Sequence, residues 1–183
     1  RAQADAQYLR RSTSRFAPHN VYSSSALLAD FVSQQTPSLP LYETWKFKDP
    51  RGSDGGGSAH LEFATPYYFV DWEYDSETQL YRRSQSGERH TTASGIDLTA
   101  VNVAIIITDI ELIDSVGRRE IRTIGEGDGY VLQDGIVIEV TWKKPSKSQR
   151  LKFYERTTGE EIMMNAGVTW IEVIGSEEDV RIE

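Results

Sequence analysis

The sequence predicts a β-rich α+β fold, in which a mainly antiparallel sheet curls into a sandwich or barrel-like form and one helix lies near the N-terminus. From about residue 59 onward, short segments of alternating or wholly apolar residues recur. Turn residues separate these segments, among them Gly87, Asp134-Gly135 and Thr158-Gly159. Residues 24–35, in contrast, carry apolar residues at helical spacing behind a run of serines that can cap a helix.

The predicted strands follow one another along the C-terminal two thirds of the chain. In residues 59–65 apolar side chains alternate with His60 and Glu62, and the same period of two recurs in residues 68–75. Val103 to Ile107 is apolar throughout, which predicts a central strand covered on both faces. The remaining predicted strands are residues 79–85, 119–124, 129–133, 136–142, 151–156 and 168–174.

Composition divides the chain at a glycine-rich segment. Residues 51–58 contain three consecutive glycines and no apolar anchor, which predicts a flexible loop. We therefore expect a β-rich domain at residues 59–183. Residues 1–50 are expected to hold a turn and the helix, which cannot continue through Pro37 and Pro40.

The charge and the residue types that are absent exclude several classes of function. The 183 residues carry a formal net charge of −8, and no nucleic-acid partner is expected because its phosphates would require clustered Lys and Arg. The chain has no cysteine, which excludes disulfides, a thiolate nucleophile and a thiolate zinc site. No stretch approaches the roughly 20 apolar residues of a membrane-spanning helix.

Motifs for metals and cofactors lack the required spacing. The three histidines, His19, His60 and His90, are far apart in sequence and show no His-x-x-x-His pattern, so no metal site is expected. The segment GEGDG, residues 125–129, fits neither a dinucleotide fingerprint nor a phosphate loop. It favours a tight turn between strands, in which glycine supplies positive φ, and no cofactor is expected.

Tryptophans are candidates for stacking on a sugar or a peptide. Trp45, Trp72 and Trp170 lie in or near predicted strands, where aromatic residues mostly belong to the core. Trp142 precedes Lys143-Lys144-Pro145 at a predicted strand exit. We expect Trp142 at an edge, where it could contact a ligand.

The segment RFAPHNVYSS, residues 15–24, resembles the Arg-x-x-Pro-His-Asn-x-Tyr-Ser/Thr signature of the bacterial YerB-like lipoproteins, the DUF3048 family. Further segments resemble the family's C-terminal region in the same order, so that the resemblance extends from about Arg15 to Ile174. These segments are residues 70–90, 98–118, 125–146 and 153–174.

The resemblance implies a secreted or lipid-anchored protein outside the cytoplasm, attached to the membrane only through a lipid anchor outside this chain. It also implies that residues 1–50 are the end of the family's N-terminal domain. The polar start of the chain, without an initiator Met, agrees with this. We therefore expect the missing N-terminal half or a second copy of the chain as a partner.

Matches to the family pattern, together with Trp142, give the candidate ligand-binding residues. The matches are Arg15, His19, Asn20, Tyr81, Arg82, His90 and Asn102. A cluster of Arg15, His19, Arg82 and His90 would suit an anionic or sugar ligand, because arginine offers a fixed fork of donors and histidine changes charge near neutral pH. Alternatively, His19 and Asn20 cap the helix and tie the turn down through backbone hydrogen bonds.

One departure from the family pattern weakens a role for one of these histidines. Where the family tends to have His-x-Asp, this chain has His90-Thr91-Thr92. The acidic neighbour that the family pattern places two positions after this histidine is therefore absent at Thr92.

Two classes of function are left open by the sequence. The favoured one is a non-catalytic extracytoplasmic module of the cell envelope that binds a glycan, an anionic molecule or a peptide. The other is a hydrolase-type enzyme whose site is shared with the missing half, with His19 or His90 as general acid or base.

Overall fold

The computed structural model describes residues 7–35, 43–64 and 67–183, and it confirms the β-rich α+β fold. The predicted connector with Pro37 and Pro40 lies outside the described residues. The chain divides into two compact units, residues 1–41 and residues 42–183. This division lies before the glycine-rich segment 51–58, at which the sequence predicts a domain boundary.

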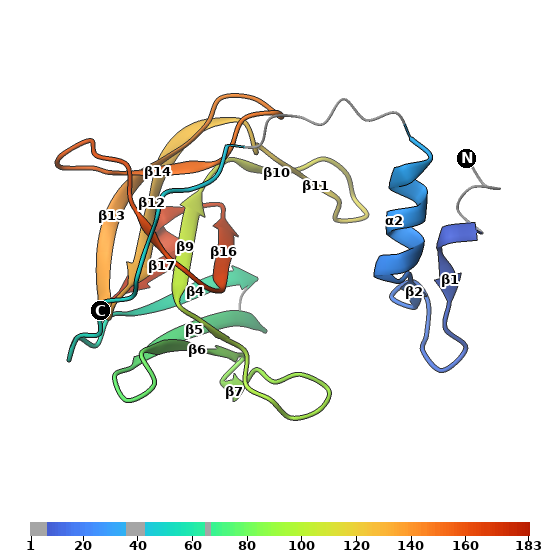
Figure 1. The fold of residues 1–183 in the computed structure, drawn as a ribbon, viewed down its shortest axis with the longest axis horizontal. Coiled ribbons are helices and arrows are strands. Elements are labelled where there is room, and N and C mark those ends of the chain that lie inside the picture. The colour runs from blue at the N-terminus through green and yellow to red at the C-terminus, as the bar shows by residue number, and fades with distance from the viewer. Residues whose placement is uncertain (1–6, 36–42, 65–66) are drawn as a thin grey trace. The chain divides into compact units, whose positions relative to one another are not determined.

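The described part of the first unit contains a two-stranded antiparallel ribbon and the helix α2 (Figure 1). Its elements are β1 (Arg10–Arg11), β2 (Val21–Tyr22) and α2 (Ser25–Ser33). Ser24 caps the helix, since its hydroxyl accepts a hydrogen bond from the N–H of Leu27 at 3.3 Å. Among the described residues of this unit, only Tyr8 and Asn20 are buried, so the unit has a very small core.

The second unit is built on two sheets of five and six strands (Figure 1). The five-stranded sheet has the order β14 (Lys152–Glu155), β13 (Ile136–Lys144), β12 (Gly125–Gln133), β9 (Asn102–Ile107) and β16 (Thr169–Ile174). The six-stranded sheet has the order β17 (Val180–Ile182), β4 (Ser58–Ala64), β5 (Tyr68–Asp75), β6 (Leu80–Gln85) and β7 (Glu88–Arg89), with β8 (Thr99–Ala100) beside β6.

Short elements complete the unit. They are the pair β10 (Ile110–Leu112) and β11 (Arg119–Ile121), the pair β3 (Phe47–Lys48) and β15 (Met164–Asn165), and the 3-10 turn η1 (Glu177–Asp179). Strands pair antiparallel throughout, except that β16 runs parallel to β9 and β15 runs parallel to β3. Within the described residues neither large sheet closes into a barrel, and no helix is long and apolar enough to cross a bilayer.

The two large sheets share one hydrophobic core. Leu61, Val70 and Trp72 of the six-stranded sheet point into it, which confirms the alternation predicted for β4 and β5. The opposite face of the five-stranded sheet packs against a second cluster, which includes Trp142 and Phe153. Strand β9 lies between β12 and β16 and contributes to both clusters, so the prediction of a central strand is confirmed.

The turns predicted at Gly87, Asp134-Gly135 and Thr158-Gly159 are confirmed. Each of these glycines has a positive φ, of 81°, 73° and 74° respectively. Asp134, with φ of 55°, joins Gly135 in a two-residue connection between β12 and β13. Positive φ at both central residues is the geometry for which Asp-Gly is selected in tight hairpins.

The glycine-rich segment 51–58, for which the sequence predicts a flexible loop, lies against the β12–β13 turn. The N–H of Gly57 donates to the carbonyl of Gly135 at 2.9 Å. A Cβ on Gly55 would lie only 2.3 Å from the same oxygen. Glycine here allows two backbones to approach closely.

The segment GEGDG also differs from its prediction, because residues 125–129 form the first half of β12 rather than a turn. Gly127 and Gly129 have no positive φ. A Cβ on Gly129 would lie 2.1 Å from the carbonyl oxygen of Ile105, and one on Gly127 would lie 2.8 Å from Nε1 of Trp142. These glycines therefore make room for neighbouring groups within the sheet.

Candidate functional site

The turn between β1 and β2 contains three of the predicted site residues. Asn20 is buried, and its Nδ2 donates to the carbonyls of Ser12 at 2.9 Å and Arg15 at 3.2 Å. Its Oδ1 accepts from the guanidinium of Arg11 at 2.7 Å. The side chains of Arg15 and His19 are exposed, and neither bonds to another described residue. Asn20 therefore ties the turn down, whereas His19 does not share this role.

In the second unit, His90 contacts Arg83 rather than Arg82. Arg82 is exposed and forms an ion pair with Asp75. Nδ1 of His90 lies 2.5 Å from the guanidinium of Arg83, whose Nε donates to Glu172 at 3.2 Å. Burial and the charge of Arg83 lower the pKa of His90, while Glu172 acts in the opposite direction.

Arg83 is enclosed between the two sheets. Its guanidinium lies over the ring of Trp170 at 5.0 Å, and Nε1 of Trp72 donates to Glu172 at 3.0 Å. Both members of the ion pair are almost fully buried. The pair joins β6 to β16, and it is a structural link because its groups face each other rather than solvent. Whether Arg15 and His19 share a surface with Arg82 and His90 stays a prediction.

Asn102 and Trp142 are fully buried. Asn102 exchanges two hydrogen bonds of 2.9 Å with the main chain of Asn165. Trp142 donates from Nε1 to the carbonyl of Ile107 at 2.9 Å, and its strand β13 lies between β12 and β14. The predicted edge position of Trp142 is therefore wrong, and both residues belong to the interior of the unit.

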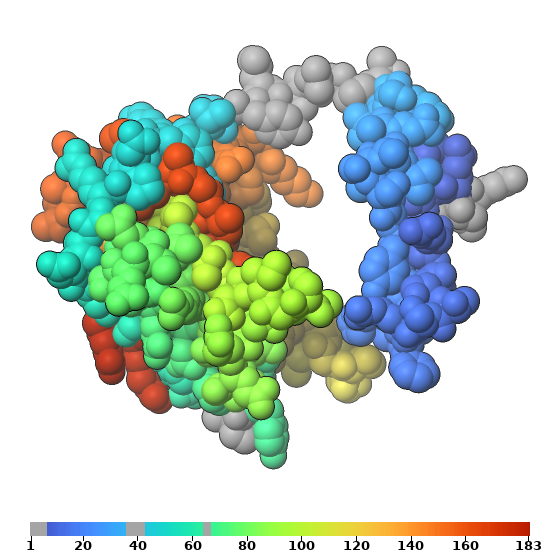
Figure 2. Space-filling model, turned by 60° about the horizontal axis from the view of Figure 1, so that its bottom comes forward, coloured from blue at the N-terminus to red at the C-terminus, as the bar shows by residue number. Residues whose placement is uncertain are grey.

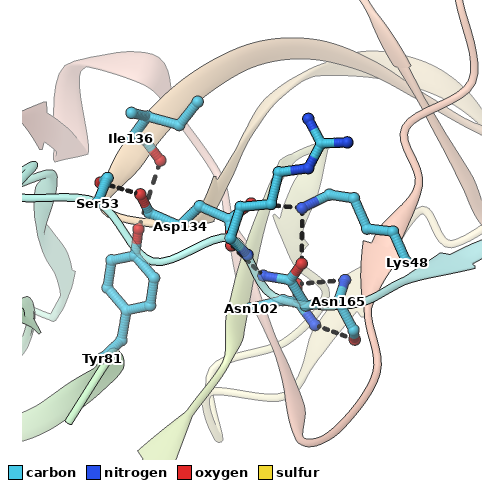
Figure 3. A network of polar contacts seen from close by, with 8 residues as sticks. Lys48, Ser53, Tyr81, Asn102, Asp134, Ile136 and Asn165 are labelled. Carbon is cyan, nitrogen blue, oxygen red and sulfur yellow. Dashed lines mark hydrogen bonds and ion pairs between the residues drawn. The ribbon is translucent and has the colours of Figure 1, made fainter.

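Asn102 is one end of a polar network that we call the clasp, formed by Lys48, Asn102, Asp134 and Asn165 (Figure 3). Lys48 pairs with Asp134 and donates to Oδ1 of Asn165 at 2.6 Å, while Nδ2 of Asn165 donates to Asp134 at 2.9 Å. Although burial would raise it, these bonds and the N–H of Arg51 hold the pKa of Asp134 below its ordinary value. The clasp ties β3, β9 and β15 to the β12–β13 turn.

His60 and His90 have separate partners in the second unit. Nδ1 of His60 lies 2.6 Å from Oδ1 of Asp71 on the neighbouring strand β5. Across the described ranges, no group of three or more His, Cys, Asp or Glu residues is arranged to hold a metal ion.

A groove of about 350 Å³ lies beside the loop that joins β13 to β14. We call it the basic groove; its lining includes the cations Lys144, Lys147 and Arg150 and the apolar side chains of Trp45, Leu151 and Ile171. The sequence contains a signal for this groove, because residues 143–150 hold four cations in eight positions. Trp142, the candidate predicted beside them, does not line it.

The cations of the basic groove have no carboxylate partner among the described residues. Lys144 bonds only to a main-chain carbonyl, at 2.7 Å, and the guanidinium of Arg150 lies over the ring of Trp45 at 4.2 Å. The acidic residue of the lining, Glu43, pairs with Lys152 at 3.2 Å. The groove therefore presents uncompensated positive charge in a chain with a net charge of −8.

Comparisons with known proteins agree with the resemblance seen in the sequence. The sequence profile described as "Protein of unknown function (DUF3048) C-terminal domain" matches residues 59–171. The "Putative lipoprotein YerB" of Bacillus subtilis (strain 168) is 25% identical over 166 residues, which cover 86% of this chain and 48% of that protein. The chain thus spans about half the length of this curated relative.

A solved structure shares the fold. The crystal structure of the YerB protein from Bacillus subtilis matches with a TM-score of 0.74 at 22% identity. The match covers 100% of this chain and 61% of that one.

Proposed function

Since the chain belongs to the DUF3048 family, whose C-terminal domain it carries, we propose that it is a non-catalytic binding module of the bacterial cell envelope that holds an anionic ligand in the basic groove. The lipoprotein name of the Bacillus subtilis relative supports a location outside the cytoplasm. Attachment to the membrane would use a lipid anchor outside residues 1–183.

The observation that carries the proposal is the set of unpaired cations around an apolar floor. Lys144, Lys147 and Arg150 attract an anion without first having to release a carboxylate. A hydrogen bond between charged groups contributes about 1.5–3 kcal/mol. The apolar floor suits the carbon skeleton of a ligand, and a glycan or polyol that carries phosphate or carboxylate groups has both features.

The lining also supports binding rather than catalysis. No histidine lines the groove among the described residues, and the carboxylate of Glu43 is paired with Lys152. A general acid or base must reach the reacting group of the substrate, and the groove offers no free pair for this task. The hydrolase alternative with His19 or His90 stays a prediction.

Calorimetric titration with a glycerol phosphate polymer tests the proposal. We expect the polymer to bind, and an uncharged glycan of similar length to bind at least about tenfold more weakly. The double substitution Lys147→Gln with Arg150→Gln should weaken polymer binding by at least about tenfold, because two charged donors are lost.

Lys143→Gln is the matched control. Lys143 lies next to Lys144 in β13 but pairs with Glu126 at 2.9 Å and does not line the groove. Its substitution should leave the affinity unchanged. Equal affinity for the neutral glycan, or equal losses in the control and the double variant, would contradict the proposal.

A further inference from the structure

The turn between β1 and β2 presents a large apolar side chain to solvent. Phe16 is 96% exposed. The same unit exposes apolar side chains on β2 and α2, including Val21 and Val32, at 43% and 53%. Figure 2 shows the surface of this unit in blue. Transfer of a large aromatic side chain from water to an apolar environment lowers its free energy.

The turn is held in one shape by hydrogen bonds. Besides the three bonds of its side chain, Asn20 accepts at its carbonyl from the N–H of Ser12 at 2.7 Å. The carbonyl of Arg15, which accepts a hydrogen bond from Nδ2 of Asn20, immediately precedes Phe16 in the chain. A preformed turn loses little conformational entropy on binding, so it is suited to dock as it stands.

Three arginines surround a hollow of about 470 Å³ beside this turn. Arg10, Arg11 and Arg15 line it together with four hydroxyl-bearing side chains, and none of the described lining residues is acidic. Arg11 donates to Asn20, whereas the guanidinium groups of Arg10 and Arg15 bond to no described residue. The hollow therefore offers two free guanidinium groups to an anion.

The charge of the chain is distributed unevenly between the two units. Residues 1–41 contain four of the 20 Lys and Arg residues but only two of the 28 Asp and Glu residues. The formal charge is therefore +2 for residues 1–41 and −10 for residues 42–183. The first unit alone carries net positive charge.

We propose that this turn is a docking surface for an anionic lipid bilayer, with Phe16 entering the interface and Arg10 and Arg15 binding lipid phosphates. A free phosphate would satisfy the arginines but would leave Phe16 in water. A second copy that packed its own turn against this one would cover Phe16 but would bring the arginines of the two copies together. A bilayer supplies phosphates and an apolar layer side by side, which is how basic and aromatic side chains bind membrane surfaces. The proposal does not rest on the basic groove.

Sedimentation of the full chain with vesicles tests the proposal. We expect binding to vesicles of phosphatidylcholine mixed with phosphatidylglycerol, and at least about tenfold weaker binding to phosphatidylcholine alone. The double substitution Arg10→Gln with Arg15→Gln should weaken binding to the anionic vesicles by about 25-fold, at about fivefold for each arginine. Phe16→Ser should weaken it by about tenfold.

Two substitutions in the second unit are matched controls. Arg51→Gln removes an exposed guanidinium that has no carboxylate partner in the described part of the chain, and Tyr67→Ser removes an aromatic ring that is 84% exposed. Both should bind the vesicles like the unaltered chain. The circular dichroism spectrum of each variant shows whether the strands of the second unit are folded. The bonds of Asn20 involve none of the side chains replaced at Arg10, Arg15 and Phe16, so the turn should keep its shape in these variants.

Three results would overturn the proposal. Equal binding to neutral vesicles would remove the role of the arginines. A loss in the arginine variant but none in Phe16→Ser would reveal an anion site without membrane insertion. A dimer that forms without lipid and is lost in Phe16→Ser would show that a second copy covers the turn.

Discussion

Arg82 and Arg83 are neighbours in β6, yet one faces water and the other is enclosed, because successive side chains of a strand point to opposite faces of the sheet. Arg83 is compensated by Glu172 and also donates to Nδ1 of His90. A ring nitrogen that accepts this bond carries no proton, so His90 is neutral in this arrangement. Protonation would place two cations in contact.

We expect His90 to make the stability of the chain depend on pH. Burial and Arg83 lower its pKa in the folded chain below the ordinary value of 6.5, at which the ring titrates when unfolded. Between the two pKa values the unfolded chain binds more protons, so the free energy of unfolding falls as the pH drops below about 6.5. Denaturation measured at a series of pH values from about 8 to about 5 shows this slope.

The variant His90→Gln should lose this part of the slope, because its amide oxygen can accept from Arg83 but does not titrate. His19→Gln is the control, since His19 is exposed and bonds to no described residue. An unchanged slope in His90→Gln would show that other groups cause the dependence.

The candidate site residues could be predicted only in part, and Arg83 shows why. The period of two places Arg83 on the same strand face as Tyr81, a core residue, so its inward direction follows from the sequence. The burial of its charge cannot be predicted from the sequence, because the partner Glu172 is 89 positions away and no local pattern links the two residues. Similarly, the positive charge of the basic groove could be read in residues 143–150, but its apolar floor comes from Trp45 in a distant segment.

Among the elements, the β12–β13 turn combines local and distant chemistry. Asp134-Gly135 is a hairpin turn by its own conformational preference, and the sequence predicts it. The carboxylate of Asp134 also holds Lys48 of β3 and Asn165 of β15, which the sequence does not reveal. In the same way, periodicity predicts each strand, but the parallel pairing of β16 with β9 depends on packing between distant segments.

We expect the clasp to stabilise the chain through the pair Asp134 and Lys48. In the variant Asp134→Asn the asparagine can adopt the same positive φ, but the negative charge is lost. This variant should lower the free energy of unfolding by about 2 kcal/mol. Lys48→Met should cost a similar amount. Because both changes remove the same ion pair, the double variant should cost clearly less than the sum. Chemical denaturation measures all three values, and simple additivity would contradict a direct coupling.

At the scale of the whole molecule, the core belongs to one of the two units. Both hydrophobic clusters draw all their members from residues 45–182. Within the described residues of the first unit, Tyr8 is the only buried apolar side chain. The described part of the first unit therefore owes little of its stability to buried apolar surface and depends on hydrogen bonds such as those of Asn20, whereas the second unit has the size and the core of an independent domain.

We therefore expect residues 43–183, produced alone, to unfold in one cooperative transition. Trp72 lies in the first cluster and Trp142 in the second, and both are fully buried, so tryptophan fluorescence follows the loss of both cores. Circular dichroism follows the strands. Because β9 contributes side chains to both clusters, neither core can be lost while the other stays intact, and the two signals should change at the same temperature. Separate transitions would show that the two clusters unfold independently, and that β9 does not couple the faces of the five-stranded sheet.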